Sequence, residues 1–407
     1  MPDASSVTCM VLVRAGSRYE TRATRGIAHF AEHMLFKGTD RWPTSYDISS
    51  CVDEIGGEIN GATGDEYTCF FIKCPANKRG LALDVLCDMI RRPRLDKTEI
   101  ESERGVIQEE IDLCHRITAR YMESLYARLL FGGQSLSWGA WGDKNFAKRA
   151  NQRHLRDFLE RWYTPDRIVI GIGGKLVGGE AQAIGEAKAL FCDMEPRLSS
   201  DLDPVCLPDV SVPRVSILYD DDDASDLVIG TLSYPENHPD NYVVDVLTTI
   251  LGGCLSSRLV TEIRERRGLS YDIFCGSYTW ADAGSVYVTA GVSADHAEEV
   301  IHAIVQELRR VAKESVPEQE LRKAKECLKG RRIFQVDSPQ GLIEFGVIGE
   351  ALRSTGAIDL QMELANIERV NQRDIQRVAK DLFDRQALQL ALAGPFKNRE
   401  RLKRLLH

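Results

Sequence analysis

HFAEH at residues 29–33 is the most informative stretch of this sequence, because it indicates a metal site on a helix. It lies within an apolar run, residues 27–36 (IAHFAEHMLF), that predicts a buried helix. Positions i and i+4 are neighbours on a helix, so His29 and His33 can share one metal ion, with Glu32 beside it. Unpaired imidazoles are costly to bury, and a metal ion supplies their partner. Two ordinary surface histidines are the alternative interpretation of so short a motif.

A third ligand is expected from a second helix, over residues 98–117. Glu110 lies there in the middle of a predicted apolar stripe, which directs its carboxylate inward. The stripe consists of Val106, Ile107, Leu113, Cys114 and Ile117. Glu103 lies two turns earlier, too far along the axis to bind the same ion, and is expected to orient a histidine ligand from behind. Glu109 is the rival ligand, and a plain charged helix surface is the alternative for all three carboxylates.

The number of ligands indicates the kind of metal site. A structural zinc ion takes four protein ligands, whereas a catalytic one usually takes three and leaves a position for water. Two histidines and one glutamate therefore favour a catalytic site. Glu32 can take a proton from the attacking water and pass it to a leaving amine.

The motifs resemble those of the M16, or pitrilysin-type, metallopeptidases, most closely the small bacterial branch related to mitochondrial processing peptidase. In that family the inverted motif H-x-x-E-H is followed by E-R-x-x-x-x-x-E, which residues 103–110 (ERGVIQEE) match. The resemblance implies that His29, His33 and Glu110 bind one Zn²⁺ per chain and that Glu32 is the general base. It also implies that the first glutamate of the second motif supports the site.

A glycine-rich segment, residues 56–63 (GGEINGAT), resembles the family's G-G-x-x-N-A-x-T sequence, with Gly61 in place of the usual alanine. The resemblance implies that Asn60, Gly61 and Ala62 bind substrate backbone at an edge strand, to which an extended peptide adds as a further strand. An ordinary turn residue before a strand is the alternative for Asn60.

A different motif lies in the second half, at residues 264–271 (RERRGLSY). It resembles the family's R-x-x-x-G-x-x-Y substrate clamp. The resemblance implies that Arg264 holds the substrate backbone and that Tyr271 stabilises the oxyanion, both reaching across to the zinc half. Read alone, these two residues are a basic helix end and a strand tyrosine.

The two halves of the chain are copies of each other at a constant offset of 220 residues. The sequence NQR at 151–153 recurs at 371–373, and the predicted strand 168–174 corresponds to 388–394. The expected counterpart of the metal helix, residues 241–255, contains no His and no Glu. The positions in the second half that correspond to Glu103 and Glu110 carry no carboxylate either. Only the first half can therefore hold zinc.

The fold expected for each half is α+β. Predicted strands, such as 7–13 and 68–74, alternate with predicted helices, such as 80–91, 99–130 and 296–312. A largely antiparallel sheet backed by helices fits this order. The resemblance implies two homologous LuxS/metallohydrolase-like domains that face each other as a clamshell.

Length and composition agree with two domains, because 407 residues with 43% hydrophobic content suffice for two cores. The predicted boundaries are 1–195 for the zinc domain, 196–213 for a proline-rich linker, and 214–407 for a metal-free domain. No apolar run is long enough for a membrane span, and no signal peptide is recognisable. Eleven scattered cysteines favour a reducing cytoplasm, and a net charge of −9 argues against nucleic acid as a partner.

The sequence therefore predicts a zinc-dependent metalloendopeptidase for short or unfolded peptides, bound as an added β-strand between the two domains. The resemblance also implies dimers, either a homodimer or a heterodimer with an M16 homologue. The alternative is a non-catalytic or partner-dependent M16 subunit that acts in binding or assembly. Relatives of that kind typically lose part of the His/Glu set, which this chain retains.

Overall fold

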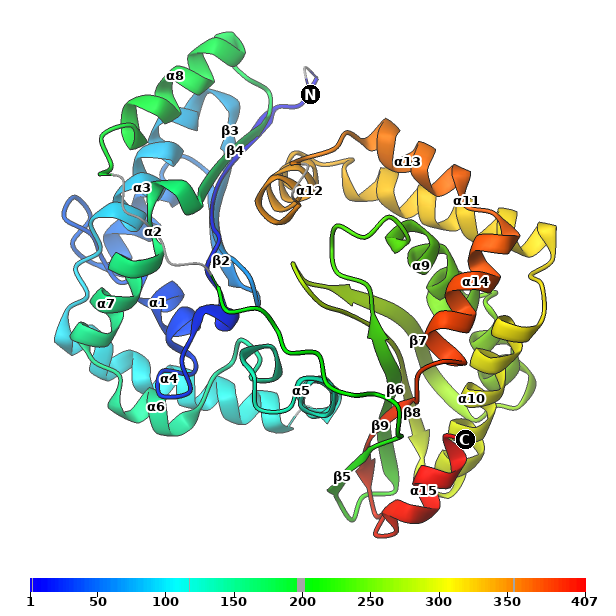
Figure 1. Cartoon of the computed structure of the whole chain (residues 1–407). Helices are drawn as coiled ribbons and strands as arrows, with labels where there is room; N and C mark the ends of the chain where they lie inside the picture. The colour runs from blue at the N-terminus through cyan, green and yellow to red at the C-terminus, as the bar shows by residue number, and fades with distance from the viewer. Residues whose placement is uncertain (2, 117, 196–201, 354–355) are drawn as a thin grey trace. The chain divides into compact units, whose positions relative to one another are not determined.

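The chain forms two compact units in the computed structural model, which describes residues 1, 3–116, 118–195, 202–353 and 356–407 (Figure 1). Unit 1 comprises Met1–Leu113, Trp138–Asp203 and Ile333–Ile358, and unit 2 comprises Cys114–Ser137, Pro204–Arg332 and Asp359–His407. Within the expected linker, residues 196–201 lie outside the described residues, and residues 202–213 form neither helix nor strand.

The sheet of unit 1 is antiparallel throughout, with the strand order β2-β3-β1-β4. Its strands are β1 (Ser6–Val13), β2 (Glu58–Thr63), β3 (Thr68–Pro75) and β4 (Ile168–Gly174). Its main helices are α1 (Ile27–Leu35), α2 (Ser45–Asp53), α3 (Arg79–Arg91), α4 (Lys97–Arg116), α6 (Lys144–Arg149), α7 (Gln152–Trp162), α8 (Gly179–Phe191) and α12 (Pro339–Leu352). Because side chains alternate along β1, Cys9 joins the main core of the unit while Met10 packs with α12 on the opposite face.

The sheet of unit 2 has the order β5-β9-β6-β8-β7. Its strands are β5 (Val215–Tyr219), β6 (Ala224–Ser233), β7 (Ser270–Thr279), β8 (Gly284–Ser293) and β9 (Gln389–Gly394). Its main helices are α5 (Thr118–Phe131), α9 (Asn241–Thr248), α10 (Ala297–Lys313), α11 (Glu318–Gln335), α13 (Leu360–Arg369), α14 (Gln372–Phe383) and α15 (Arg399–Leu405). The expected largely antiparallel sheet is confirmed, with one parallel pair that makes it mixed, because β5 runs parallel to β9.

The duplication is visible in the topology, since β2-β3-β1-β4 in unit 1 repeats as β7-β8-β6-β9 in unit 2. The NQR repeats begin equivalent helices. Asn151 caps α7 by accepting from the backbone N–H of His154, and Asn371 caps α14 by accepting from that of Asp374. The sheets differ at one edge, where β5 lies beside β9.

The units differ from the predicted domains 1–195 and 214–407 by two helices. Helix α5 comes from the first half of the chain but belongs to unit 2, where Tyr126 Oη donates to the carbonyl of Val286 at 3.1 Å. Helix α12 comes from the second half but packs on the sheet of unit 1 through Ile343 and Val347. Each sheet has a second apolar face to bury, and a helix distant in sequence covers it. Within the described ranges, no helix has both the length and the apolar character that crossing a membrane requires.

Candidate metal centre

Helix α1 carries the metal motif and is held at its first turn by Glu20. Gly26 precedes the helix with a φ of 94°, a conformation that favours glycine. The carboxylate of Glu20 accepts the backbone N–H groups of Gly26 at 2.7 Å and Ala28 at 2.9 Å. These are donors that a helix start leaves without intrahelical partners. The helix is buried as predicted, and His29 is only 8% exposed.

Three potential ligand atoms converge between α1 and α4. The Nε2 atoms of His29 and His33 lie 3.1 Å apart, and Glu110 Oε2 lies 3.4 Å from each of them. Zinc binds nitrogen at about 2.0–2.1 Å in tetrahedral sites, which places neighbouring ligand atoms about 3.3 Å apart. The three residues therefore fit a zinc ion and form a candidate metal site.

Behind His33 lies Glu103, a nearly buried carboxylate on α4. His33 Nδ1 lies 2.8 Å from Glu103 Oε1, and Lys37 Nζ lies 2.5 Å from Glu103 Oε2. Burial alone would raise the pKa of Glu103, but its bonds to His33 and Lys37 outweigh burial and lower the pKa. The charged carboxylate can accept the Nδ1 proton of His33, which leaves Nε2 free to bind a metal ion.

The pKa values of the two histidines are shifted in opposite directions. Burial, followed by the neighbouring His33, lowers the pKa of His29 to about 4, so His29 is neutral at pH 7. For His33, burial also lowers the pKa, but the hydrogen bond to Glu103 and the surrounding carboxylates together raise it. His29 Nδ1 is buried without a hydrogen-bond partner among the described residues, and the ring of Trp141 lies edge-on at 5.6 Å.

The surroundings of Glu110 correct the predicted apolar stripe. Ile107 and Cys114 are buried, but Val106 is 43% and Leu113 is 47% exposed. Ile117 lies outside the described residues. Glu110 therefore lies at the rim of the buried face of α4, and the stripe centred on it was wrong. Glu109, the rival ligand, is exposed and lies outside the metal cluster.

Glu32 lies beside the cluster and contacts β2. Thr63 Oγ1 donates to Glu32 Oε2 at 2.5 Å, and a Cβ atom added to Gly61 would lie 3.1 Å from Glu32 Oε1. Burial raises the pKa of Glu32, although the Thr63 hydrogen bond partly counters this. The Glu32 carboxylate therefore lies beside the candidate metal ligands, where the predicted role as proton acceptor requires it.

Strand β2 is an edge strand, and its backbone has a defined orientation. Gly64 N–H donates to the carbonyl of Tyr67 at 2.8 Å, which sets the alternation of hydrogen bonds along the β2/β3 pair. By that alternation the backbone groups of Ile59, Gly61 and Thr63 face away from β3. The exposed Asn60 accepts the N–H of Gly61 through Oδ1 at 2.8 Å, and Ala62 is also exposed.

Arg264 and Tyr271 lie in unit 2 and contact each other. The Arg264 guanidinium carbon lies 5.0 Å from the centre of the Tyr271 ring, and Tyr271 is 84% exposed. Their expected roles in substrate binding remain predictions.

Sequence reasoning missed three residues that surround the site. The sequence could have indicated Thr63, because it lies two residues after Gly61 and therefore on the same face of the strand. It could also have indicated Lys37, because Lys37 follows His33 by one helical turn. Trp141 comes from a distant loop, and no local pattern indicated its contact with His29.

Two descriptions of one peptidase family match the chain. Residues 1–130 match the insulinase family, peptidase family M16, and residues 149–328 match the M16 inactive domain. Similar sequences include the uncharacterized zinc protease YmxG of Bacillus subtilis, which is 29% identical over 98% of this chain and 95% of its own length. An uncharacterized zinc protease of Streptomyces coelicolor is 28% identical over 98% of this chain and 87% of its own length.

Solved structures share the fold. A protease from Helicobacter pylori superposes with a TM-score of 0.87 at 21% identity, covering 96% of this chain and 95% of that one. A Pseudomonas fluorescens structure described as a peptidase M16 inactive domain gives a TM-score of 0.86 at 17% identity, covering 98% and 95%.

Proposed function

Because the chain belongs to the M16 peptidase family, we propose that it is a zinc-dependent metalloendopeptidase whose metal ligands are His29, His33 and Glu110. The observation that carries this proposal is the geometry of the ligand atoms. Their separations of 3.1 and 3.4 Å fit one tetrahedral ion, and among the described residues three protein ligands converge there. Three ligands with an adjacent carboxylate are typical of catalytic rather than structural zinc.

The chain's own residues supply the proton transfers. Zinc, when bound, would lower the pKa of a coordinated water to about 7 and polarise the scissile carbonyl. Glu32 accepts the proton of the attacking water and delivers it to the departing amine nitrogen. Thr63 fixes Glu32 Oε2 at 2.5 Å, so the carboxylate keeps one orientation during both transfers. Glu103 holds the ring of His33 in the orientation that presents Nε2.

We propose that substrate binds as a strand added to β2. The outward backbone groups of Ile59, Gly61 and Thr63 can pair with an extended peptide, next to Glu32. Folded proteins rarely offer a free extended segment, which favours short or unfolded peptides. Asn60 would release the N–H of Gly61 to the substrate, and Ala62 completes this binding segment. Arg264 and Tyr271 are proposed to hold the substrate backbone and to stabilise the oxyanion.

The decisive experiment is hydrolysis of a quenched fluorescent peptide library by the purified chain, with and without chelator. The Glu32→Gln variant is compared with Glu109→Gln, whose side chain is exposed and lies outside the metal cluster. We expect chelator-sensitive cleavage that Glu109→Gln retains and Glu32→Gln loses, with zinc still bound in both. Cleavage that survives in Glu32→Gln would contradict the assignment of the base.

The same experiment tests the requirement for a partner. Zinc binding without cleavage would instead favour a subunit that depends on a second M16 chain. The expected homodimer or heterodimer is then tested by repeating the assay with a homologous chain added.

A further inference from the structure

A turn of unit 2, residues 254–257, lies against helix α11 and begins with a cysteine. Lys323 Nζ donates to the carbonyl of Ser256 at 2.7 Å, which joins the turn to α11. Directly after the turn, the Arg258 guanidinium donates to both carboxylate oxygens of Glu320, each at 2.8 Å. The turn is therefore held on the helix by two successive contacts.

The contacts follow one side of α11. The helix residues that take part are spaced by three, four and four positions, so they lie above one another on the helix surface. They are Glu320, Lys323, Cys327 and Arg331. At the other end of the turn, a Cβ atom added to Gly253 would lie 3.4 Å from Nη1 of Arg331. The turn thus runs antiparallel to the helix, and this register places Cys254 opposite Cys327.

The two thiol groups meet at this point. The thiol of Cys327 interacts with that of Cys254 and with the guanidinium of Arg331. Both cysteines are free and only half-buried, and Leu255 beside them is 79% exposed. A small solute can therefore reach the pair. Because the thiols already face each other, small rotations of the two side chains can bring the sulfur atoms to the 2.05 Å or so of a disulfide bond.

We propose that Cys254 and Cys327 form a reversible disulfide by exchange with a low-molecular-weight disulfide of the glutathione type. The thiolate of Cys254 attacks one sulfur of the small disulfide, whose S–S bond breaks and releases a small thiolate. The thiolate of Cys327 then attacks the sulfur of Cys254 and displaces the second small thiolate. Each leaving thiolate takes up the proton that a protein thiol gave. Two protein thiols are oxidised to one disulfide, and one small disulfide is reduced to two thiols.

The order of the two attacks follows from the surroundings of Cys327. Burial raises the pKa of Cys327, and the neighbouring Arg331 counters this only in part. A thiol with a raised pKa is rarely ionised at pH 7 and attacks an external disulfide slowly. Once the mixed disulfide has formed on Cys254, the reacting sulfurs are held close together, and this proximity offsets the small thiolate fraction. Cys254 is therefore the attacking thiol, and Cys327 closes the bond.

The disulfide would fasten α11 to the turn. It joins positions 73 residues apart in the sequence, so it would also restrict the unfolded chain. Both cysteines belong to unit 2, whereas the candidate metal ligands belong to unit 1. The proposal does not depend on peptidase activity, and it can be tested with protein that has been treated with chelator.

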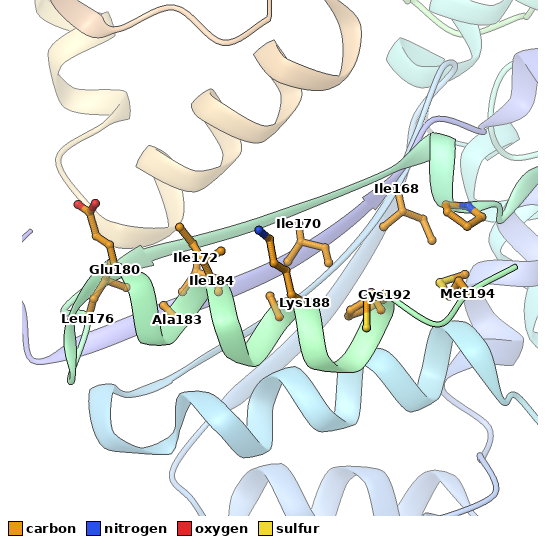
Figure 2. A pocket seen from close by; sticks show the side chains of 13 residues that line it. Ile168, Ile170, Ile172, Leu176, Glu180, Ala183, Ile184, Lys188, Cys192 and Met194 are labelled. Atoms are coloured by element: carbon orange, nitrogen blue, oxygen red, sulfur yellow. The ribbon is translucent and has the colours of Figure 1, made fainter. Parts of the chain in front are cut away.

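The first test treats the full chain with oxidised glutathione, alkylates the remaining thiols and maps the products by mass spectrometry. We expect a disulfide between Cys254 and Cys327, and a lasting glutathione adduct on Cys192. Cys192 is the internal comparison, because it is exposed and lines the apolar pocket between β4 and α8 in unit 1, as Figure 2 shows. A lasting glutathione adduct on Cys254, with Cys327 alkylated in the same molecules, would overturn the proposal.

Single variants separate the two attacks. Cys327→Ser should trap the glutathione adduct on Cys254, whereas Cys254→Ser should form an adduct on Cys327 at least about tenfold more slowly. Cys206→Ser is the matched control, because Cys206 is an exposed cysteine of the same unit, and this variant should still form the disulfide. Circular dichroism shows whether each variant is folded. Equal rates of adduct formation in folded Cys254→Ser and Cys327→Ser would contradict the proposed order.

The second test measures the equilibrium between dithiol and disulfide in mixtures of reduced and oxidised glutathione. In Lys323→Met, we expect half-oxidation at a ratio [GSH]²/[GSSG] that is lower by about threefold or more. The lost bond to Ser256 is worth about 0.5–1.5 kcal/mol, and without it the turn holds Cys254 less firmly against α11. Arg322→Met is the matched control, because Arg322 is an exposed cation on the same helix. An unchanged ratio in Lys323→Met would contradict the contact register on which the proposal rests.

Discussion

His33 Nδ1 lies 2.8 Å from Oε1 of Glu103, and this contact joins the helix with the two histidines to the helix with Glu110, the third candidate metal ligand. The contact determines which ring nitrogen of His33 carries the proton. Lys37 binds the other oxygen of Glu103, so the carboxylate is held from both sides. The orientation of His33, a candidate metal ligand, therefore depends on two residues outside the candidate ligand set.

We expect Glu103→Ala to weaken zinc binding about 10- to 100-fold, the usual effect of losing such a partner. Without the carboxylate, His33 loses the acceptor that fixes its ring and its proton. Competition against a chromophoric chelator measures the affinity. The zinc affinity of Glu103→Gln should lie between those of Glu103→Ala and the unmodified chain. The amide oxygen of the glutamine can still accept a hydrogen bond from Nδ1 of His33, but it carries no charge.

Glu110→Gln should lose bound zinc during purification, whereas Glu109→Gln should keep one zinc ion per chain. The carboxylate of Glu110 lies 3.4 Å from both histidine nitrogens, while Glu109 is exposed. Metal analysis of the dialysed proteins checks this. Loss of zinc from Glu109→Gln instead would reverse the choice of third ligand.

Thr63→Val is expected to lower kcat/KM at pH 7 about tenfold and to move its acid limb to higher pH. The hydrogen bond from Thr63 lowers the pKa of Glu32, against the effect of burial, so removing it raises that pKa further. Glu32 must be ionised to accept a proton, so activity falls as the pH drops through its pKa. A hydrogen bond to a charged group contributes about 1.5–3 kcal/mol, which agrees with at least a tenfold effect. An unchanged pH–rate profile would exclude this role.

Glu186→Gln should destabilise unit 1 by about 2 kcal/mol at pH 7, because it leaves the buried Arg79 without its charged partner. Arg79 donates to both carboxylate oxygens of Glu186, at 2.8 and 2.9 Å, and lowers its pKa below the usual 4.5. The stabilisation is therefore present above pH 4.5 and is lost as the pH falls through the lowered pKa. Urea unfolding at several pH values checks this, and the difference between the variant and the unmodified chain should shrink in acid.

Asn151→Ala and Asn371→Ala should each reduce the free energy of unfolding by about 1 kcal/mol. Each asparagine caps a helix at an equivalent place in the two repeats. Asn145→Ala is the control, because that side chain is exposed and caps no helix. Similar reductions in the free energy of unfolding for the two variants would agree with the duplication. If either substitution left the free energy of unfolding unchanged, the two asparagines would not have equivalent capping roles.

Much of the site followed from local pattern. The spacing of His29 and His33 is a helix-surface relationship, so a single helix suffices to bring them together. The choice of Glu110 was harder, because the stripe used to select it is partly exposed at Val106 and Leu113. The packing of α4 against its neighbours determines how far its buried face extends. The residue pattern of a single helix cannot predict that extent.

The exchange of α5 and α12 between the repeats had no signal in the sequence. Both helices are apolar enough to cover a sheet, and residue patterns do not state which sheet each one covers. The parallel pairing of β5 with β9 was missed for the same reason. Strand pairing joins residues 175 positions apart, such as Val215 and Leu390, whereas the alternation of side chains indicates only the two faces of one strand.

The sequence by itself determined the metal motif, the duplication at a constant offset and the confinement of the His/Glu set to the first half. These depend on residue identity and on the periods of helices and strands, which are local properties of a chain. Only the tertiary structure decided that Thr63 contacts Glu32, that Lys37 and His33 share Glu103, and that α5 belongs to unit 2 and α12 to unit 1. Those contacts join segments distant in sequence, and the burial of apolar faces selects them among many pairings that the local patterns allow equally.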